Sequence, residues 1–435
     1  PHQPDRGHPG GVQRDSGRAV QALLIQSVYN IVDSYFVSRY SDAGLTALSI
    51  IFPIQLFMTA LATGTGTGIN ILLSRMDGTG KTESQAGLVK SGLFLGILNY
   101  LIFACIGLLF IGSYYSVSSG QIPVQEQGVQ YARIIFAGSF GLFVESNCTK
   151  IIQAKGNMVT PMIAQVTGAV INVILDPVLI FGMFGMPELG IAGAAFATIA
   201  GQIAAMVITL IAVCRIYHFQ GKVQAENCIK IYQSGFPSIV MQSLYTFYIV
   251  GLNLILKQFT EDAVTVLGIY YKLQTFFFIP LMGLQQVILP VISFNYGAGK
   301  KQRVKDVLKY STLFSCSIMF VAAVIFMIIP EQLLSIFSNS DSIIQIGCYA
   351  LRVIAGSFIP SGLVMMFTVY FQGIDRGKAS LFITILRQVI LLVPLAWIFH
   401  YAGLKFVWFT FMVTEMIAAS VCLILYKTKG GKFHG

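Results

Sequence analysis

Charged side chains are scarce in this chain of 435 residues. Asp, Glu, Lys and Arg make up 11% of it, whereas soluble domains carry about 25%. Hydrophobic residues make up 55%, and the mean hydropathy is +0.74. This balance excludes an ordinary soluble domain and predicts an integral membrane protein. The formal net charge of +10 does not indicate nucleic-acid binding, because the basic residues lie in short loops between apolar runs.

Signatures of catalysis and of metal binding are also missing from the sequence. The five histidines do not cluster, and the seven cysteines show no disulfide or metal-ligand spacing. The sequence contains no nucleophile elbow, phosphate loop or zinc signature. A membrane-embedded enzyme would need clustered catalytic side chains, such as His and Asp at the membrane interface. We therefore expect no enzyme, no cofactor, no structural metal and no nucleic-acid partner.

Long apolar runs account for most of the chain. A helix needs about 20 apolar residues to cross a bilayer, and twelve runs reach or approach that length. These candidate spans are residues 19–37, 44–73, 88–112, 129–152, 158–183, 190–214, 230–257, 264–294, 307–330, 345–372, 379–400 and 403–426. The sequence predicts an all-α integral membrane protein with twelve transmembrane helices.

Basic residues divide unevenly among the connections between these runs. The even-numbered connections and the tail hold most of them, while the odd-numbered connections hold only Arg39, Lys257 and Lys405. By the positive-inside rule, the even connections and both termini are expected to face the cytoplasm. We expect a multi-pass protein of the cell membrane.

Short motifs recur at an offset of 216 to 220 residues. Gln-Ser-Val-Tyr at 26–29 returns as Gln-Ser-Leu-Tyr at 242–245, and Ala-Gly-Ser-Phe at 137–140 returns unchanged at 355–358. Six helices per copy give both copies the same orientation, so a parallel repeat of two pseudo-symmetric lobes is expected. Transporters of this kind bind substrate between the halves. The expected parts are an atypical polar segment 1–18, an N-lobe 19–214, a cytoplasmic linker 215–229, a C-lobe 230–426 and a basic tail 427–435.

One carboxylate lies deep in an apolar run. Asn172 and Asp176 are four residues apart and share one helix face, and Pro177 removes a backbone donor beside them. An ionised Asp near the bilayer centre costs roughly 2.5–3.5 kcal/mol, so such residues are rare and usually functional. The stretch could hold and release a small cation. It could equally be a buried Asp that neighbouring helices hold for packing specificity.

Several motifs together resemble one transporter family. They are Tyr-Asn-Ile-Val-Asp-Ser at 29–34, Ser-Arg at 74–75, Gln-Ala-Lys-Gly-Asn at 153–157, Asn-Val-Ile-Leu-Asp-Pro at 172–177, Gly-Ala-Ala-Phe-Ala-Thr at 193–198 and Asn-Tyr-Gly at 295–297. Over about residues 20–426 the chain is similar to the multidrug and toxic compound extrusion (MATE) family, in its DinF-like branch. The resemblance implies two six-helix lobes around a central cavity. It also implies export of amphipathic, mostly cationic drugs in exchange for protons or sodium.

The resemblance also implies a coupling site. Carried over onto matching positions, it comprises Asp33, Asn172, Asp176 and Thr198. Burial and a nearby like charge both favour the neutral form of a carboxyl group. We expect Asp33 and Asp176 to take up protons when open to the outside, which releases the drug cation, and to lose them toward the cytoplasm. The expected partners are small organic cations or other amphipathic drugs and the lipid bilayer, with the chain acting as a monomer.

The sequence departs from the family in two places. The family usually carries more of an apolar first helix where this chain has the polar residues 1–18, so a frame error or altered start is the first expectation and a divergent arm the second. A different branch of the family places acidic sodium ligands in the seventh and eighth helices. Here residues 233–259 and 264–298 hold no Asp or Glu, which argues against that site. A sodium ion at Asp33, Asn172 and Asp176 stays an alternative, since amide and carboxylate oxygens suit a hard cation.

Other residues in apolar runs leave alternatives open. Glu145 could be a further coupling carboxylate or could neutralise a nearby basic group, and Glu415 is expected to be structural. Lys272 and Arg387 could attract anionic groups, as a flippase of lipid-linked oligosaccharides in the same superfamily would require, or could snorkel to a headgroup. The glycines at 64, 66 and 68 are expected to let helices approach closely. The residues that could line a drug cavity are Tyr29, Asn30, Tyr245, Lys272, Phe276, Met365 and Arg387.

Overall fold

The computed structural model describes most of the chain. The described residues are 17, 18, 20, 21, 24, 25, 32, 33, 35–37, 39–81, 83–217, 221–336 and 339–430, with side chains at all of these except 42, 45, 46, 49, 246, 261, 429 and 430. Two residues predicted to line the cavity, Tyr29 and Asn30, lie outside the described residues. So does the predicted polar segment 1–18, apart from Gly17 and Arg18.

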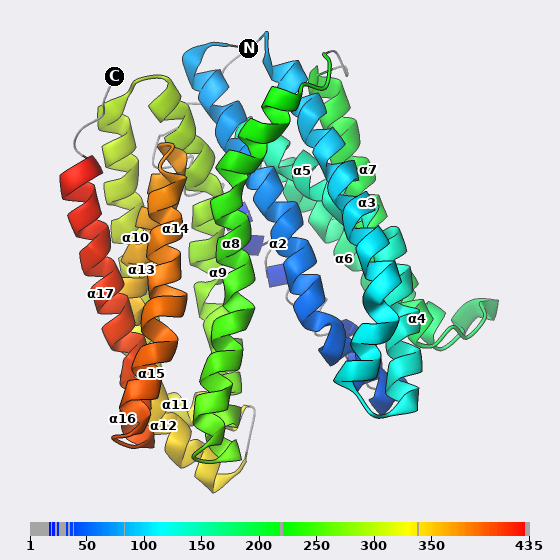
Figure 1. Cartoon of the computed structure of the whole chain (residues 1–435), viewed down its shortest axis with the longest axis vertical. Coiled ribbons are helices and arrows are strands. Elements are labelled where there is room, and N and C mark those ends of the chain that lie inside the picture. The colour runs from blue at the N-terminus through cyan, green and yellow to red at the C-terminus, as the bar shows by residue number, and fades with distance from the viewer. Residues whose placement is uncertain are drawn as a thin grey trace. The chain divides into compact units, whose positions relative to one another are not determined.

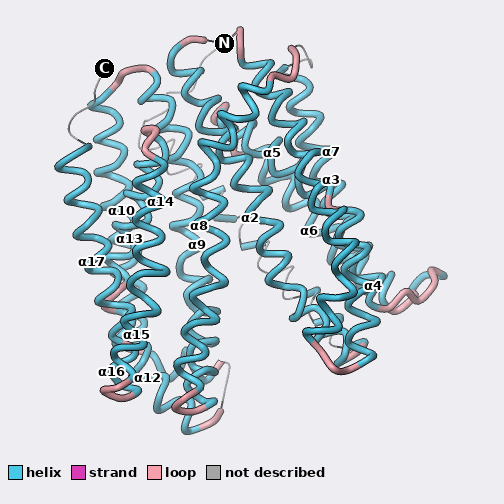
Figure 2. The backbone as a smooth tube through the Cα atoms, viewed as in Figure 1, coloured by secondary structure: helices cyan, strands magenta, loops and turns pink. Residues whose placement is uncertain are grey.

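Every regular element in the described part of the chain is a helix (Figure 2). Nine of these helices are long and apolar enough to cross a membrane, and a bent pair makes a tenth span. The predicted fourth span is divided at Ser139 into two shorter helices. The predicted first span, 19–37, is only partly described.

The first compact unit holds the described residues up to Gln242. Within it α2 packs on α3, α4 and α5, and α5 and α6 each pack on α7 (Figure 1). Ser41 begins α2 by accepting a hydrogen bond from the backbone N–H of Gly44 (3.1 Å), which satisfies a donor at the helix start. The helices of this unit are α2 (Asp42–Thr79), α3 (Gln85–Ser118), α4 (Ile122–Gly138), α5 (Phe140–Ala154), α6 (Val159–Ile180), α7 (Ile191–Tyr217) and the first part of α8 (Ala225–Lys257).

Glycines set the closest helix contacts in this unit. A Cβ built on Gly64 would lie 2.3 Å from the side chain of Ile239, and one on Gly68 would lie 2.2 Å from the carbonyl oxygen of Ile231. Both contacts join α2 to the first part of α8. The expectation that these glycines allow close helix approach is confirmed.

The second compact unit begins at Ser243. Its core is built from α9, α10, α12, α13 and α17 around large rings such as Phe326, Phe358 and Trp408. In Figure 1, α10 and α13 lie side by side, in agreement with their packing contact. Its elements are the end of α8, α9 (Glu261–Gly297), α10 (Lys301–Ile328), α11 (Pro330–Ser335), α12 (Asp341–Ala355), α13 (Phe358–Gly373), α14 (Gly377–Ile385), the π turn η2 (Leu386–Leu391), α15 (Leu392–His400), α16 (Leu404–Val407), α17 (Phe409–Leu425) and a last π turn η3 (Tyr426–Gly430).

The repeated motif Ala-Gly-Ser-Phe marks the same structural event in each unit. Ser139 lies between α4 and α5, and its Oγ donates to the carbonyl oxygen of Phe136 (2.9 Å). Ser357 lies between α12 and α13, and its Oγ donates to the carbonyl oxygen of Ile354 (2.6 Å). The second of these helix pairs is bent by 50°. The internal repeat therefore extends from the sequence to a helix break.

The two compact units divide at Gln242, within α8. A linker was expected at 215–229, but α7 continues to Tyr217 and α8 already begins at Ala225. The glycine contacts described above attach the first part of α8 to α2, which explains why packing assigns it to the first unit. The basic tail expected at 427–435 begins as the π turn Tyr426–Gly430. The lobe limits 19–214 and 230–426 stay a prediction.

Candidate functional site

The centre of the candidate site is a buried carboxyl group on α6. Asp176 is 0% exposed and Asn172, one turn earlier, is 2% exposed. The helix continues past Pro177 to Ile180. Because proline has no N–H, the carbonyl group four residues earlier, that of Val173, lacks its usual helical partner. The shared face of Asn172 and Asp176 that the spacing predicted is present in the structure.

A glycine crossing brings α7 against this face. A Cβ on Gly168 would lie 2.7 Å from the carbonyl oxygen of Gly201, and one on Gly201 would lie 2.5 Å from that of Gly168. The same Cβ on Gly201 would lie 3.4 Å from Asn172. Only residues without side chains let the two backbones approach this far. The crossing places Thr198 of α7 opposite Asn172.

The Asn172 amide connects the two helices. One orientation of the amide satisfies both of its ends. Its oxygen then accepts from the backbone N–H (3.0 Å) and Oγ1 (3.2 Å) of Thr198, and its nitrogen donates to Asp176 Oδ2 (3.1 Å). Thr198 Oγ1 also approaches the carbonyl oxygen of Ala194 within its own helix (3.0 Å). Three of the four predicted coupling residues thus form one hydrogen-bonded chain.

The fourth predicted residue, Asp33, joins this chain. The carboxyl groups of Asp33 and Asp176 lie within hydrogen-bonding reach of each other. Aromatic packing holds the segment of Asp33 in place. The rings of Phe36 and Tyr40 lie edge-on to Phe181 at the end of α6, with ring centroids 6.5 Å and 6.2 Å apart. The structure therefore brings together all four residues that the family resemblance marked.

The contact between the two carboxyl groups has a chemical requirement. An ionised carboxylate has acceptors only, so two carboxyl groups can be hydrogen-bonded to each other only when one carries a proton. Asp33 Oδ1 and Asp176 Oδ1 are both buried and have no hydrogen-bond partner among the described residues. At hydrogen-bonding distance the pair can share one proton, with two further acceptor oxygens enclosed beside it. Loss of the proton would leave two negative charges in contact.

Glu145 lies elsewhere in the first unit. Its Oε1 accepts a hydrogen bond from Thr149 Oγ1 one turn along α5 (2.6 Å). The nearby Lys150 donates instead to Gln153 (3.1 Å), and the side chain of Lys150 packs close to Gly66 of α2. No described contact connects Glu145 with the Asp33–Asp176 pair. Its two predicted roles, coupling or charge neutralisation, stay predictions.

The charged residues predicted for the second unit do not form a common cluster. Arg387 donates from Nε to Glu415 Oε1 (2.5 Å), so the residue expected to be structural is the partner of one expected to line the cavity. Lys272 is exposed, and so is Phe276, with 62% of its surface accessible. Tyr245 stacks edge-on against Tyr248. Met365 is partly buried against the core, and its carbonyl oxygen accepts from Gln285 (3.1 Å).

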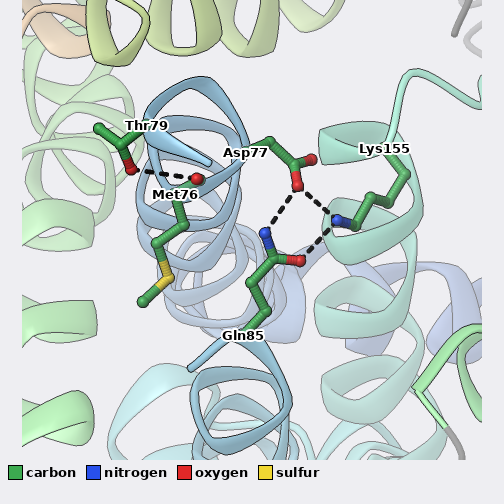
Figure 3. A network of polar contacts seen from close by, with 5 residues as sticks. All are labelled: Met76, Asp77, Thr79, Gln85 and Lys155. Carbon is green, nitrogen blue, oxygen red and sulfur yellow. Dashed lines mark hydrogen bonds and ion pairs between the residues drawn. The ribbon is translucent and has the colours of Figure 1, made fainter. Parts of the chain in front are cut away.

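One network of polar and charged side chains near the connections of the first unit was not predicted from the sequence (Figure 3). Lys155 Nζ donates to Asp77 Oδ1 (2.6 Å) and to Gln85 Oε1 (2.7 Å). Gln85 Nε2 donates to the same oxygen of Asp77 (2.7 Å), so the three side chains close a triangle. This triangle joins the end of α2, the start of α3 and the end of α5. In the sequence, Lys155 stands out only as part of the motif at 153–157.

A family model described as MatE matches residues 19–178 and 237–398, which together exceed half of the chain. The chain belongs to the MATE family. The two matched segments begin at positions whose separation falls within the offset of the internal repeat. MATE proteins are membrane transporters, so this chain is a multi-pass membrane transporter and not an enzyme, as expected.

Two named relatives differ in what their names say they carry. The FAD transporter of Shewanella oneidensis is 25% identical over 404 residues, covering 91% of this chain and 89% of the relative. Multidrug export protein MepA of Staphylococcus aureus is 25% identical over 412 residues, covering 92% of this chain and 90% of the relative.

Solved structures confirm the expected fold of this MATE protein. A MATE transporter in its bent conformation matches with a TM-score of 0.90 at 24% identity, covering 98% of this chain and 96% of that one. A MOP superfamily transporter from Pyrococcus furiosus matches with a TM-score of 0.89 at 24% identity, covering 96% and 95%. The all-α architecture of twelve membrane helices in two six-helix lobes is thereby confirmed.

Proposed function

We propose that this MATE protein exports amphipathic, mostly cationic compounds in exchange for protons, and that Asp33 and Asp176 carry the exchange. The observation that supports this most directly is the close approach of the carboxyl groups of Asp33 and Asp176, each of which has one enclosed oxygen. A protonated pair is compact and carries one negative charge fewer than the ionised pair. Uptake of protons therefore removes the countercharge that would hold a cationic compound.

The orientation of Asn172 favours protons over sodium as the coupling ion. A sodium ion binds through oxygen ligands, as hard cations do. In the orientation that satisfies both ends of the amide, the Asn172 oxygen accepts a hydrogen bond from the backbone N–H of Thr198, and its nitrogen faces Asp176. Sodium at Asp33, Asn172 and Asp176 would require the amide to rotate and give up this bond. A proton requires no such change.

The proposed cycle alternates between two charge states of the first unit. Facing outward, the pair takes up protons and the bound cation leaves. Facing the cytoplasm, the protons dissociate and the next cation binds. One proton for one monovalent cation moves no net charge, so the pH gradient alone would drive the exchange. A second proton would add roughly 2.3 kcal/mol per 100 mV of membrane potential. The inward face is assigned by the positive-inside rule, with both termini in the cytoplasm.

The names of the two relatives suggest two classes of substrate for this chain. The multidrug exporter MepA supports drug-like cations, and the FAD transporter supports an anionic, phosphate-bearing compound. The carboxylate pair in the first unit favours cations. A flippase for lipid-linked oligosaccharides is less well supported, because it would want several cationic residues together and Arg387 is already paired with Glu415. We therefore place cationic compounds first.

The experiment is transport by the purified protein in liposomes, with the pH and sodium gradients imposed separately and a cationic dye as cargo. Wild-type efflux should follow the pH gradient. Asp33→Asn and Asp176→Asn should each abolish it while the protein still reconstitutes as a folded monomer. Glu331→Gln, which neutralises an exposed carboxylate on α11, is the matched control and should transport normally. Wild-type transport by either aspartate variant would disprove the mechanism.

A further inference from the structure

A guanidinium group lies at membrane depth in the second unit. Arg387 belongs to the π turn between α14 and α15, well inside the 24-residue candidate span Gly377–His400. A charge in this position is costly and usually faces the protein interior or water. Single π turns within helices occur often at functional sites. Together these two features single out Arg387 as a residue with a use beyond packing.

The pairing of Arg387 leaves much of its hydrogen-bonding capacity unused. A guanidinium has five N–H donors. One, on Nε, goes to Glu415 Oε1 (2.5 Å), and one, on Nη2, makes a long contact with Ser361 Oγ (3.5 Å). Three donors therefore have no acceptor among the described residues. The Arg387 side chain is 22% exposed, and Nη1 is not among the enclosed atoms that lack a partner.

The guanidinium donors of Arg387 that Glu415 does not use can bind an anion. Glu415 binds at Nε, and Ser361 makes only a long contact at Nη2, so the edge formed by Nη1 and Nη2 has no close acceptor among the described residues. That edge matches the two oxygens of a carboxylate or a phosphate, which can accept two parallel hydrogen bonds from it. Glu415 meanwhile holds the guanidinium in one orientation. Its side chain is only 10% exposed.

The surroundings of the pair add polar atoms that have no partner. The buried side-chain atoms without a hydrogen-bond partner in this part of the chain include two hydroxyls, those of Thr410 and Thr414, which can donate to an anion, and two acceptor oxygens, Gln388 Oε1 and Glu415 Oε2, which can only bind a donor such as water. Buried polar atoms are normally satisfied, so each one left over calls for a ligand or water. The two threonines lie on α17 within five residues of Glu415. Tyr248 and Tyr270 come near enough to both charges of the pair to interact with them electrostatically.

We propose that the Nη edge of Arg387 binds a carboxylate or phosphate group of the transported compound, and that Glu415 positions Arg387 for this contact. The inference rests on the proposed function. It adds to the substrate class amphipathic compounds that carry an anionic group. A lipid phosphate offers the same chemistry, but it would have to leave the headgroup region to reach the middle of the span.

A pair of probes separates this role from a structural one. A xanthene dye with a free carboxylate and its methyl ester differ in one anionic group and share their size and ring system. Binding of each is measured by fluorescence polarisation to the full chain in nanodiscs of neutral lipid. In the variant Arg387→Gln/Glu415→Gln, both charges are removed together so that neither remains buried alone. It should bind the acid at least tenfold more weakly than wild type and the ester within twofold of wild type.

Two single variants should change binding of the acid in opposite directions. Glu415→Gln keeps an acceptor oxygen for Arg387 Nε, and so keeps the guanidinium in position, but it removes the competing negative charge. The acid should therefore bind several-fold more tightly, with the ester unchanged. Arg387→Lys keeps the charge but loses the planar edge, so binding of the acid should weaken. Size-exclusion profiles and thermal midpoints establish that each variant is folded. Equal losses for acid and ester, or weaker acid binding in Glu415→Gln, would overturn the inference.

The remaining outcomes are also decisive. Failure of the wild type to bind the acid overturns the inference, while intact acid binding with no response to a pH gradient overturns only the proposed function. Repeating the measurement with anionic phospholipid in the nanodiscs distinguishes the two phosphate sources. Acid binding should be unchanged. Competition by the lipid would assign the site to headgroups and overturn the inference that the compound is its ligand.

Discussion

The amide nitrogen of Asn172 lies 3.1 Å from Asp176 Oδ2, and the amide oxygen lies 3.0 Å from the backbone nitrogen of Thr198. One side chain therefore anchors the buried carboxyl group of α6 to the backbone of α7. The contact with Thr198 is made twice, through the main chain and through the hydroxyl, and the two can be separated by mutation.

Asn172→Ala should reduce pH-driven efflux about tenfold or more, because hydrogen bonds to charged groups contribute about 1.5–3 kcal/mol. Thr198→Val is nearly isosteric and removes only the hydroxyl. It should reduce efflux less than threefold, since the backbone N–H still holds Asn172. The measurement is the initial rate of dye efflux from liposomes at equal protein content. Equal losses in the two variants would show that the amide does not act through Asp176.

The crossing of α6 and α7 should tolerate no added methyl group. Gly201→Ala places a Cβ 2.5 Å from the carbonyl oxygen of Gly168, a separation that must be relieved by moving a backbone. Such overpacking typically costs 1–3 kcal/mol, so the thermal midpoint in detergent should fall by several degrees, at about 1 kcal/mol for each few degrees.

Gly112→Ala is the matched control for this crossing. Gly112 also lies inside a long helix, α3, but no atom lies within 4 Å of its added Cβ. Alanine is the better helix former, so the midpoint should stay the same or rise slightly. A Gly201→Ala protein with an unchanged midpoint would mean that the two helices can separate freely at this crossing.

Much of the fold was readable from the sequence because its signals are local. Apolar runs and loop charges predicted the membrane helices, and the spacing of Asn172 and Asp176 predicted their common face. Two contacts were not readable because they join distant positions. Arg387 and Glu415 are 28 residues apart on different helices, and Lys155 and Asp77 are 78 apart. The π turn that carries Arg387 leaves no signature in residue type either.

The triangle of Asp77, Gln85 and Lys155 should stabilise the first unit. Lys155→Met removes the ion pair with Asp77, whose side chain is only 12% exposed, and keeps the hydrogen bond from Gln85. The loss should be about 1–3 kcal/mol, as for a polar group left unsatisfied. A lower thermal midpoint in detergent is the expected result. The swap Asp77→Lys with Lys155→Asp should recover part of it.

The exposed pair Lys230–Glu226 serves as the control for that experiment. Its two side chains are 52% and 76% exposed, so solvent already screens their charges. Lys230→Met should leave the midpoint unchanged. A midpoint that falls equally in Lys230→Met and Lys155→Met would assign the effect to lost surface charge and not to the triangle.

The serine hydroxyls at the two helix breaks, Ser139 and Ser357, should contribute differently to stability although the motif around them is identical. At Ser357 the backbone N–H already bonds the carbonyl oxygen of Ile354 at 2.8 Å, so the hydroxyl adds a second bond to a satisfied group. At Ser139 the corresponding backbone contact with Phe136 is 3.4 Å, and the hydroxyl supplies the shorter bond of 2.9 Å. Ser139→Ala should therefore lower the thermal midpoint more than Ser357→Ala. If Ser357→Ala proves the more damaging change, then the hydroxyl at that break holds the 50° bend itself, and the satisfied backbone bond is not enough to keep it.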